Sequence, residues 1–195
     1  MNLTPITLTG RLVRLEPLGP QHVHQLAQAG HGEDIWTYMR YGAVTSEDKM
    51  AEMVNMLLAR QAQGTDLPFA VIYLTTGRAV GMTRYMDIEP ANRTLEIGGT
   101  WYEPACQHTG VNTGCKYLLL RYAFETLEVI RVQFKADLRN ERSQQALARL
   151  GAVREGVLRN HIILPDGTVR SSVYYSILAE EWPEVKMDLE QKMQV

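Results

Sequence analysis

The strand and helix patterns along this sequence predict an α/β (α+β) fold built on one mixed sheet. In the middle of the chain, strands alternate with helices, which favours parallel pairing there. On either side, consecutive strand-like runs are joined by short turns, as in antiparallel hairpins. The 195 residues, 45% of them apolar, suffice for one substantial core, so we expect a single domain over residues 1–195.

The first third of the chain predicts one strand and two helices. Apolar and polar residues alternate over Arg11–Leu18, as in a half-buried strand. A helix over Gln21–Ala29 follows a proline, which is favoured at a first helical position. Thr45 or Ser46 can cap the next helix, in which apolar side chains over Met50–Leu58 recur at helical spacing and indicate a core-facing side.

Three strands follow this helix. Runs over Leu67–Leu74 and Arg78–Ile88 flank the turn sequence Thr75-Thr76-Gly77 and should form a hairpin. The next strand, Thr94–Tyr102, contains Gly98-Gly99 in its middle. Because glycine weakens a strand interior, this pair indicates a β-bulge or a close backbone approach.

The second half of the chain alternates helices and strands and then forms a long hairpin. In order, we expect a helix from Gly110, a strand over Arg131–Asp137, a helix over Glu141–Leu150 capped by Asn140, strands over Val153–Leu164 and Thr168–Leu178, and a terminal helix over Glu180–Gln194. The sequence Pro165-Asp166-Gly167 between the last two strands is a strong turn signal.

The chain is organised around the junction between the strand that ends before Pro104 and the helix that begins at Gly110. A polar loop, Ala105–Thr109, joins the two elements. A helix start of this kind presents unpaired backbone N–H groups and the positive end of the helix dipole, which together favour an anion such as a phosphate. An ordinary strand–loop–helix connection has the same local pattern, so the pattern alone leaves both interpretations open.

This loop resembles motif A of the GNAT superfamily, the Gcn5-related acyl-CoA N-acyltransferases. That motif reads Gln/Arg-x-x-Gly-x-Gly/Ala and wraps the coenzyme A pyrophosphate. Its first and fourth positions match here, whereas the sixth holds an asparagine in place of a small residue. The six positions are filled by Gln107, His108, Thr109, Gly110, Val111 and Asn112. The chain as a whole resembles the branch that acetylates ribosomal-protein N-termini (RimJ/RimL-type).

The resemblance implies a GNAT fold, a mixed and mostly antiparallel sheet of seven strands flanked by helices. In that fold the bulged fourth strand splays away from the fifth, and the pantetheine arm of the co-substrate acetyl-CoA lies in the V-shaped slot. Backbone N–H groups near Thr100 and Trp101 would polarise the thioester. His108 would either contact the cofactor or be a solvated loop residue. The implied cofactor contacts are Thr100, Trp101, Tyr102, Gln107, His108, Thr109, Gly110, Val111, Asn112, Thr113 and Asn140.

The resemblance also implies that Glu96 is the general base. A carboxylate shielded from water has a raised pKa and can accept the amine proton, whereas a strand-surface carboxylate in an ion pair is the alternative. Between Glu96 and Pro104 the chain is one residue longer than the branch pattern Glu-Leu-Gly-Tyr-Trp-Leu-x-Pro. A one-residue slip turns a side chain to the other face of the sheet unless a bulge, such as one at Gly98-Gly99, absorbs it.

The run NERSQQALARLGA, which begins at Asn140, resembles the family segment Asn-x-x-Ala/Ser-x-x-x-Tyr-x-x-x-Gly-Phe. By this resemblance Asn140 would bond the pantetheine and Ser143 would assist the leaving thiolate. Helix capping is the alternative for both residues. Leu147 occupies the place of the tyrosine that many members use as a general acid, so that tyrosine is absent.

The acceptor site is the least readable part of the sequence. The aromatic segment Ile35–Gly42 is either ordinary loop packing or a wall of the acceptor cleft, which this region forms in the resembled family. His161 and Tyr174 lie on the last two strands near that cleft, but core or surface packing is the better interpretation of each alone. Cys106 or Cys115 could be a nucleophile, but a small core thiol is the better interpretation of Cys115, on the apolar side of its helix.

Composition excludes several other classes of protein. A formal net charge of −2 gives no electrostatic basis for binding nucleic acid. No apolar run reaches the ~20 residues of a membrane helix, and the first residues lack the features of a signal peptide. The five histidines show no ligand spacing and the two cysteines form no framework, so we expect no metal and a reducing cytoplasm. The sequence is compatible with a homodimer and does not determine the oligomeric state.

We therefore expect an acetyl-CoA-dependent N-acetyltransferase that transfers the acetyl group directly to a primary amine, with a protein N-terminal amine as the first choice. A small-molecule amine is the alternative within the enzyme class. A non-catalytic acyl-CoA-binding module is the alternative from another class. Asn112 and the absence of the tyrosine are compatible with this non-catalytic hypothesis, whereas Glu96 and Ser143 argue against it.

Overall fold

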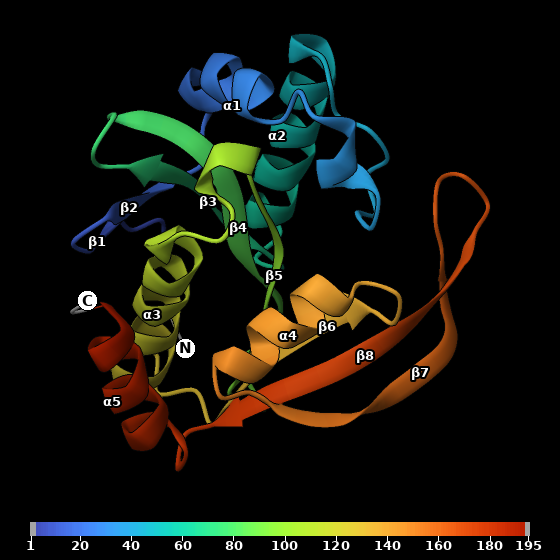
Figure 1. Cartoon of the computed structure of the whole chain (residues 1–195). Helices are drawn as coiled ribbons and strands as arrows, with labels where there is room; N and C mark the ends of the chain where they lie inside the picture. The colour runs from blue at the N-terminus through green and yellow to red at the C-terminus, as the bar shows by residue number, and fades with distance from the viewer. Residues whose placement is uncertain (1–2, 194–195) are drawn as a thin grey trace.

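The computed structural model describes residues 3–193. Over these residues the chain forms one eight-stranded sheet, in the order β1-β2-β3-β4-β5-β6-β8-β7, and five α-helices (Figure 1). The strands are β1 (Leu8–Thr9), β2 (Val13–Pro17), β3 (Leu67–Tyr73), β4 (Arg78–Glu89), β5 (Thr94–Tyr102), β6 (Arg131–Asp137), β7 (Val153–Ile163) and β8 (Val169–Leu178). The α-helices are α1 (Val23–Ala29), α2 (Glu47–Ala62), α3 (Gly110–Glu125), α4 (Glu141–Arg149) and α5 (Trp182–Met193).

The predicted mixed, mostly antiparallel sheet is confirmed, with one strand more than the seven expected. The additional strand is β1, whose two residues pair with β2 and are too short to show a periodic pattern. The predicted helix over Gln21–Ala29 begins as a 3-10 turn, Pro20–His22, before α1. The terminal helix begins at Trp182, later than expected, and Gln194 lies outside the described residues. Between residues 3 and 193 no helix is long and apolar enough to cross a bilayer.

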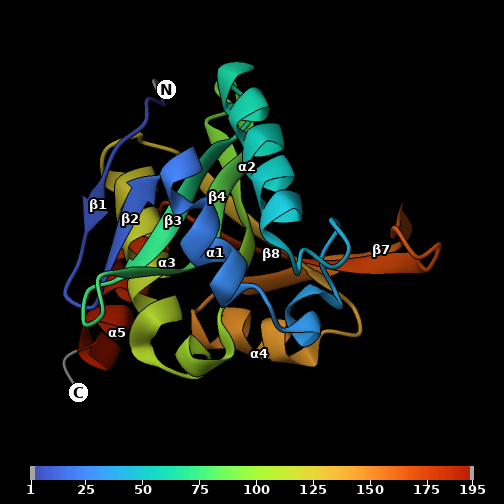
Figure 2. The ribbon, with the colours of Figure 1, turned by 90° about the horizontal axis from the view of Figure 1, so that it is seen from above.

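The two faces of the sheet carry different helices, as the view from above shows (Figure 2). On one face, side chains of α3, α4 and α5 such as Leu119, Leu147 and Leu189 complete a large apolar core. On the other face, α1 and α2 contribute Leu26 and Met50 to a second core. We call these the α3 face and the α2 face. β3 and β4 contribute apolar side chains to both cores, as expected for strands covered by helices on both faces.

A β-bulge interrupts β5 at its paired glycines, as expected. Met82 of β4 lies opposite Trp101, whereas Arg84, two residues further along β4, lies opposite Gly98. β5 therefore holds one extra residue over this interval. Gly99 has a φ of +57°, a conformation that glycine adopts without steric cost. The bulge absorbs the one-residue insertion in this strand.

The parallel pairing of β5 with β6 stops immediately before this bulge. Thr94–Glu96 pair with Arg131–Gln133, and beyond these residues the two strands continue without a hydrogen-bonded register. On its other side β6 stays paired with β8 along its whole length. The strands therefore diverge as a V, which confirms the splay expected between the fourth and fifth predicted strands, here β5 and β6.

The hairpin of β7 and β8 extends beyond the rest of the sheet and curls toward the segment before α2 (Figure 1). The guanidinium of Arg170 on β8 donates to the backbone carbonyl of Tyr38 at 3.2 Å. Arg170 is buried, so this contact attaches the hairpin to a loop 132 residues earlier in the chain. The hairpin and the loop together form the outer boundary of the α2 face next to β6.

Gly81 should tolerate no side chain, because β4 and β5 approach closely beside the bulge. A Cβ there would lie 2.1 Å from the carbonyl oxygen of Trp101 and 2.9 Å from the Cα of Tyr102. We expect Gly81→Ala to lower the free energy of unfolding by about 1–3 kcal/mol, as overpacking does. In the matched control Gly156→Ala, the new Cβ has no neighbour within 4 Å. Equal urea midpoints for the two variants would contradict the close approach.

Candidate active site

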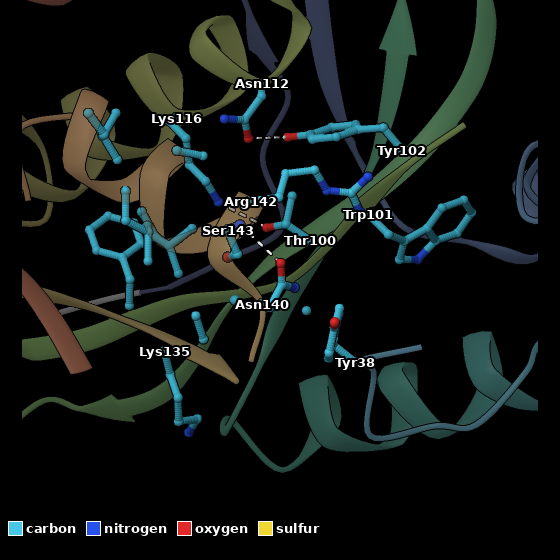
Figure 3. Close-up of a pocket in the computed structure, with 18 of the residues that line it drawn as sticks. Tyr38, Thr100, Trp101, Tyr102, Asn112, Lys116, Lys135, Asn140, Arg142 and Ser143 are labelled. Atoms are coloured by element: carbon cyan, nitrogen blue, oxygen red, sulfur yellow. Dashed lines mark hydrogen bonds between the residues drawn. The ribbon is translucent and has the colours of Figure 1, made fainter. Parts of the chain in front are cut away.

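A cleft of about 760 Å³ opens where β5 and β6 diverge (Figure 3). Its walls come from the diverging ends of the two strands, the first turns of α3, the helix α4 and residues 35–41. The lining includes Lys116 and Leu147 from the α3 face and Glu96 and Tyr38 from the α2 face. The cleft therefore passes through the sheet, with one mouth on each face.

The loop before α3 has the geometry of an anion site. The hydroxyl of Thr109 donates to the carbonyl of Cys106 at 2.7 Å and accepts from the N–H of Val111 at 3.3 Å, which makes Thr109 the N-cap of α3. His108 turns the chain into the helix with a φ of +58°. A helix start holds further N–H groups without intrahelical partners. Three residues of this first turn line the cleft: Gly110, Asn112 and Thr113.

All but one of the predicted cofactor contacts line the cleft. The exception is Val111, whose side chain is turned into the core on the α3 face. The indole ring of Trp101 packs against Trp36 on the α2 face, 5.0 Å between ring centroids. The contacts that line the cleft are Thr100, Trp101, Tyr102, Gln107, His108, Thr109, Gly110, Asn112, Thr113 and Asn140.

The unusual residue of the loop, Asn112, has a structural partner. Its side-chain oxygen accepts a hydrogen bond of 3.2 Å from the hydroxyl of Tyr102, so it attaches the first turn of α3 to the end of β5 (Figure 3). Gln107 forms a second link, because its Nε2 donates to the carbonyl of Tyr102 at 3.3 Å while its Oε1 accepts from Arg142 at 2.6 Å. The loop is thus fixed to both β5 and α4.

Glu96 lies inside the sheet at the point where the strands separate. Its neighbours Leu95 and Ile97 point into the core of the α3 face, so the carboxylate points to the α2 face, where it lines the cleft while only 2% exposed. Gln133 Nε2 and Lys135 Nζ each lie 3.1 Å from its Oε2. Burial raises the pKa of Glu96, and the ammonium of Lys135 opposes that rise. The alternative role, an ion pair, is therefore present, but the pair is buried and faces the cleft.

Asn140 and Ser143 occupy the first turn of α4 beside the cleft. The side-chain oxygen of Asn140 accepts a 3.0 Å hydrogen bond from the N–H of Ser143, so Asn140 is the N-cap, the alternative weighed for it (Figure 3). Capping uses one acceptor and leaves the Asn140 Nδ2 and the Ser143 hydroxyl without a partner in residues 3–193. Both residues and Leu147 line the cleft, so helix capping and ligand contact are compatible here.

Lys116 was missed by sequence reasoning. It is 6% exposed on the α3 face, and its Nζ donates to the hydroxyl of Thr100 at 2.9 Å, which in turn lies 2.8 Å from the hydroxyl of Thr83. The ammonium also lies 5.8 Å from the centroid of Phe134. Burial lowers the pKa of Lys116 to about 8. Its one signal in the sequence is a cation one helical turn after Asn112, in a helix that is otherwise apolar on this side.

Positive side chains gather at the mouth of the cleft on the α3 face. Arg142 and Arg149 of α4 and Lys192 of α5 line it there, whereas the lining carboxylates, Glu96 and Asp137, lie on the strands. The chain carries a formal net charge of −2, so this is a local concentration of positive charge. Sequence reasoning missed these cations because helices far apart in the sequence bring them together.

At the other mouth, the aromatic segment both packs into a core and lines the cleft. Tyr38 and Tyr41 line the cleft, whereas Trp36 is buried in the core of the α2 face. His161 and Tyr174 pack against each other with ring centroids 5.8 Å apart and are not among the lining residues. Burial and nearby cations lower the pKa of His161.

The two thiols are unsuited to nucleophilic attack. Burial raises the pKa of Cys106 to about 11 and that of Cys115 to about 12, so both are neutral near pH 7. Cys115 is fully buried in the core of the α3 face, in agreement with its interpretation as a core thiol. In residues 3–193 no three His, Cys, Asp or Glu side chains are grouped as metal ligands.

Comparison with known proteins agrees with this geometry. The acetyltransferase (GNAT) domain family matches residues 12–153, well over half of the chain. The chain belongs to the GNAT acetyltransferase family. It is therefore an N-acetyltransferase, an acyltransferase whose family uses acetyl-CoA as the acyl donor. The resemblance inferred from the loop and from the segment after Asn140 is confirmed.

Relatives place this GNAT protein near ribosomal-protein acetyltransferases. YdaF of Bacillus subtilis (strain 168), provisionally named a ribosomal N-acetyltransferase, is 35% identical over 109 residues, which span 56% of this chain and 58% of YdaF. A provisionally assigned acetyltransferase from T. thermophilus is 39% identical with a TM-score of 0.89, covering 98% of this chain and 99% of that one. Mycobacterium smegmatis RimJ in complex with CoA-disulfide shares the fold at a TM-score of 0.80, with 23% identity over 96% of this chain and 95% of RimJ.

The raised thiol pKa values predict slow alkylation. A free cysteine has a pKa of ~8.5, so at pH 8 its thiolate fraction far exceeds that of Cys106 or Cys115. We expect iodoacetamide to modify the native protein at least about tenfold more slowly than glutathione at pH 8. In urea both cysteines should react at the free rate. Intact-mass spectrometry measures both rates, and rapid single labelling of the native protein would show an activated thiol.

Proposed function

We propose that this GNAT protein transfers an acetyl group from acetyl-CoA directly to a primary amine, and that the amine is a protein N-terminus. The observation that carries the proposal is the cleft through the sheet between β5 and β6, with a loop of backbone donors at one mouth and a buried carboxylate facing the other. Two substrates that enter from opposite faces can react inside the slot without an acyl-enzyme. Residues 1–195 would act as one catalytic domain.

Acetyl-CoA would bind at the mouth on the α3 face. Its pyrophosphate would accept hydrogen bonds from the first turn of α3, and the cations of α4 and α5 would balance its charge. The edge of β5 beyond Glu96 has no strand partner on the β6 side, so the amides of pantetheine could pair with it as an added strand would. Asn140 would donate a hydrogen bond from its Nδ2 to the pantetheine arm. RimJ, which shares the fold, was solved in complex with CoA-disulfide, which supports binding of coenzyme A by a protein of this fold.

In the proposed reaction, Glu96 accepts the proton of the incoming ammonium from the α2 face. The free amine then attacks the thioester carbon, whose developing oxyanion accepts hydrogen bonds from backbone N–H groups near Thr100 and Trp101. The new C–N bond forms, the nitrogen releases its second proton to solvent, and the C–S bond breaks with its electron pair going to sulfur. Ser143, across the cleft, would donate a hydrogen bond to the leaving thiolate. The neutral, buried thiols support direct transfer.

The choice of a protein N-terminus as the acceptor rests on the relatives. YdaF is named for a ribosomal substrate, and it matches this chain over 109 residues. A small-molecule amine and a non-catalytic acyl-CoA-binding role are the alternatives. A panel of peptides with free N-termini, their N-blocked analogues, polyamines and amino acids, assayed for release of CoA thiol, separates the three. Turnover with free but not blocked peptides supports the proposal, and turnover with polyamines alone overturns it.

Arg142 should contribute to binding of coenzyme A. Replacing it by alanine removes one cation beside the loop, and we expect the Kd for CoA to rise about tenfold, as expected for losing one charged hydrogen bond of ~1.5 kcal/mol. Arg154→Ala on β7 is the matched control, because Arg154 is exposed and not part of the cleft lining. Isothermal calorimetry measures both variants. Equal affinities in the two would remove Arg142 from the phosphate site.

Glu96 should control the acid limb of the pH profile. The pKa of Glu96 is raised by burial, and a general base must be ionised, so the maximal rate should rise with pH through that pKa. Glu96→Gln keeps the shape and removes the base, so we expect the rate to fall by about 10²–10⁴-fold and the limb to be lost or displaced. The Kd for acetyl-CoA should stay the same in Glu96→Gln and in the parent. If Glu96→Gln keeps the parent's acid limb and most of its rate, Glu96 is only a structural partner of Lys135.

A further inference from the structure

The two buried ionisable groups of the cleft lie on opposite sides of the sheet. Glu96 points to the α2 face, where the proposed acceptor enters. Lys116 reaches the slot from the α3 face, where the loop and α4 would hold the cofactor (Figure 3). Its ammonium is bonded to Thr100, the residue that follows the bulge. The leaving sulfur belongs to the cofactor, so Lys116 is on the side of the sheet from which the sulfur departs.

The lining on this side includes the exposed side chains of His108 and Lys192, but few buried groups there could protonate a thiolate inside the slot. Leu147 is apolar and lines the wall of the cleft. The hydroxyl of Tyr102 already donates to Asn112, and burial raises its pKa well above the ordinary value. The hydroxyl of Ser143 can donate a hydrogen bond, but an alcohol is too weak an acid to give up its proton to a thiolate. The ammonium of Lys116 is the remaining acid among these lining residues.

We propose that Lys116 is the general acid that protonates the departing CoA thiolate. The inference rests on the proposed function, because it requires CoA in the slot. When the C–S bond breaks, the electron pair stays on sulfur and takes a proton from the Lys116 Nζ, which leaves CoA–SH and a neutral amine. The amine regains its proton from solvent after CoA–SH departs. Ser143 then orients the sulfur, and Thr100 holds the ammonium in place.

The charges around Lys116 suit this role. On its own helix Cys115 is neutral, because burial raises its pKa to about 12, and Tyr102 on β5 is neutral as well. Glu96 is the nearby carboxylate, but it is already paired with Lys135 of β6, and α4 adds a further cation, Arg142, to the cleft lining. Lys116 is therefore buried with little compensating charge, which lowers its pKa to about 8. A thiol has a pKa of ~8.5, so donor and acceptor are closely matched.

The first test needs no turnover. The thiolate absorbance of CoA, titrated in its complex with the protein, reports the pKa of the bound thiol. An ammonium within contact should hold that pKa about 1–3 pH units lower in the parent than in Lys116→Met, which keeps the length of the side chain without the charge. Lys186→Met on α5, where Lys186 pairs with Glu125 and is not among the residues that line the cleft, is the control and should match the parent.

Each outcome of this titration has a distinct meaning. If the bound thiol has the same pKa in the parent and in Lys116→Met, the inference fails while the proposed function stands. If the parent does not bind CoA at all, the proposed function itself fails. A methionine in place of a buried, weakly compensated lysine should not unfold the protein, and circular dichroism checks this.

The second test separates proton donation from charge alone. Lys116→Met should lose about 10²–10⁴-fold in maximal rate, together with the descending limb that we expect for the parent above about pH 8. Lys116→Arg keeps the charge but cannot give up a proton near neutral pH. It should therefore restore the low pKa of the bound thiol without restoring the rate. Full recovery of the rate in Lys116→Arg, or an unchanged descending limb in Lys116→Met, would overturn the assignment.

Discussion

The separation of β5 from β6 is the constraint on which the rest of the site depends. Three residue pairs join the strands, and then the bulge at Gly98-Gly99 turns β5 away while β8 keeps β6 in place. Two adjacent strands that diverge inside a sheet leave backbone groups unpaired, which is costly unless a ligand or water satisfies them. The structure thus holds a gap at the position where a strand-like ligand arm would fit.

The same gap explains why ionisable groups are buried in the middle of the sheet. The pKa of Glu96 is raised and that of Lys116 is lowered, in both cases first because burial disfavours the charged form. Each shift brings the group closer to neutral pH, where it can exchange a proton. Because the sheet separates the two, the proposed proton acceptor faces one mouth and the proposed donor faces the other. The Lys135 ammonium opposes the rise in the pKa of Glu96, which would help keep the carboxylate ionised for its proposed role as base.

Much of this fold could be predicted from the sequence, because its strands and helices carry strong local signals. The hairpins, the N-cap Asn140 and the bulge at the paired glycines depend on backbone preferences of neighbouring residues. β1 could not be found, since two residues carry no period. Lys116 and Arg142 could not be assigned either, because their positions in the cleft depend on how α3 and α4 pack across the slot.

A bisubstrate conjugate tests the central claim, that the cleft admits two substrates from opposite faces. CoA joined through an acetyl bridge to the N-terminal amine of a short peptide would have to pass through the slot between β5 and β6. The account predicts that this conjugate binds about 10²–10⁴-fold tighter than CoA, because the second contact becomes intramolecular. Calorimetry that gives the conjugate and CoA the same Kd would contradict a continuous passage through the sheet.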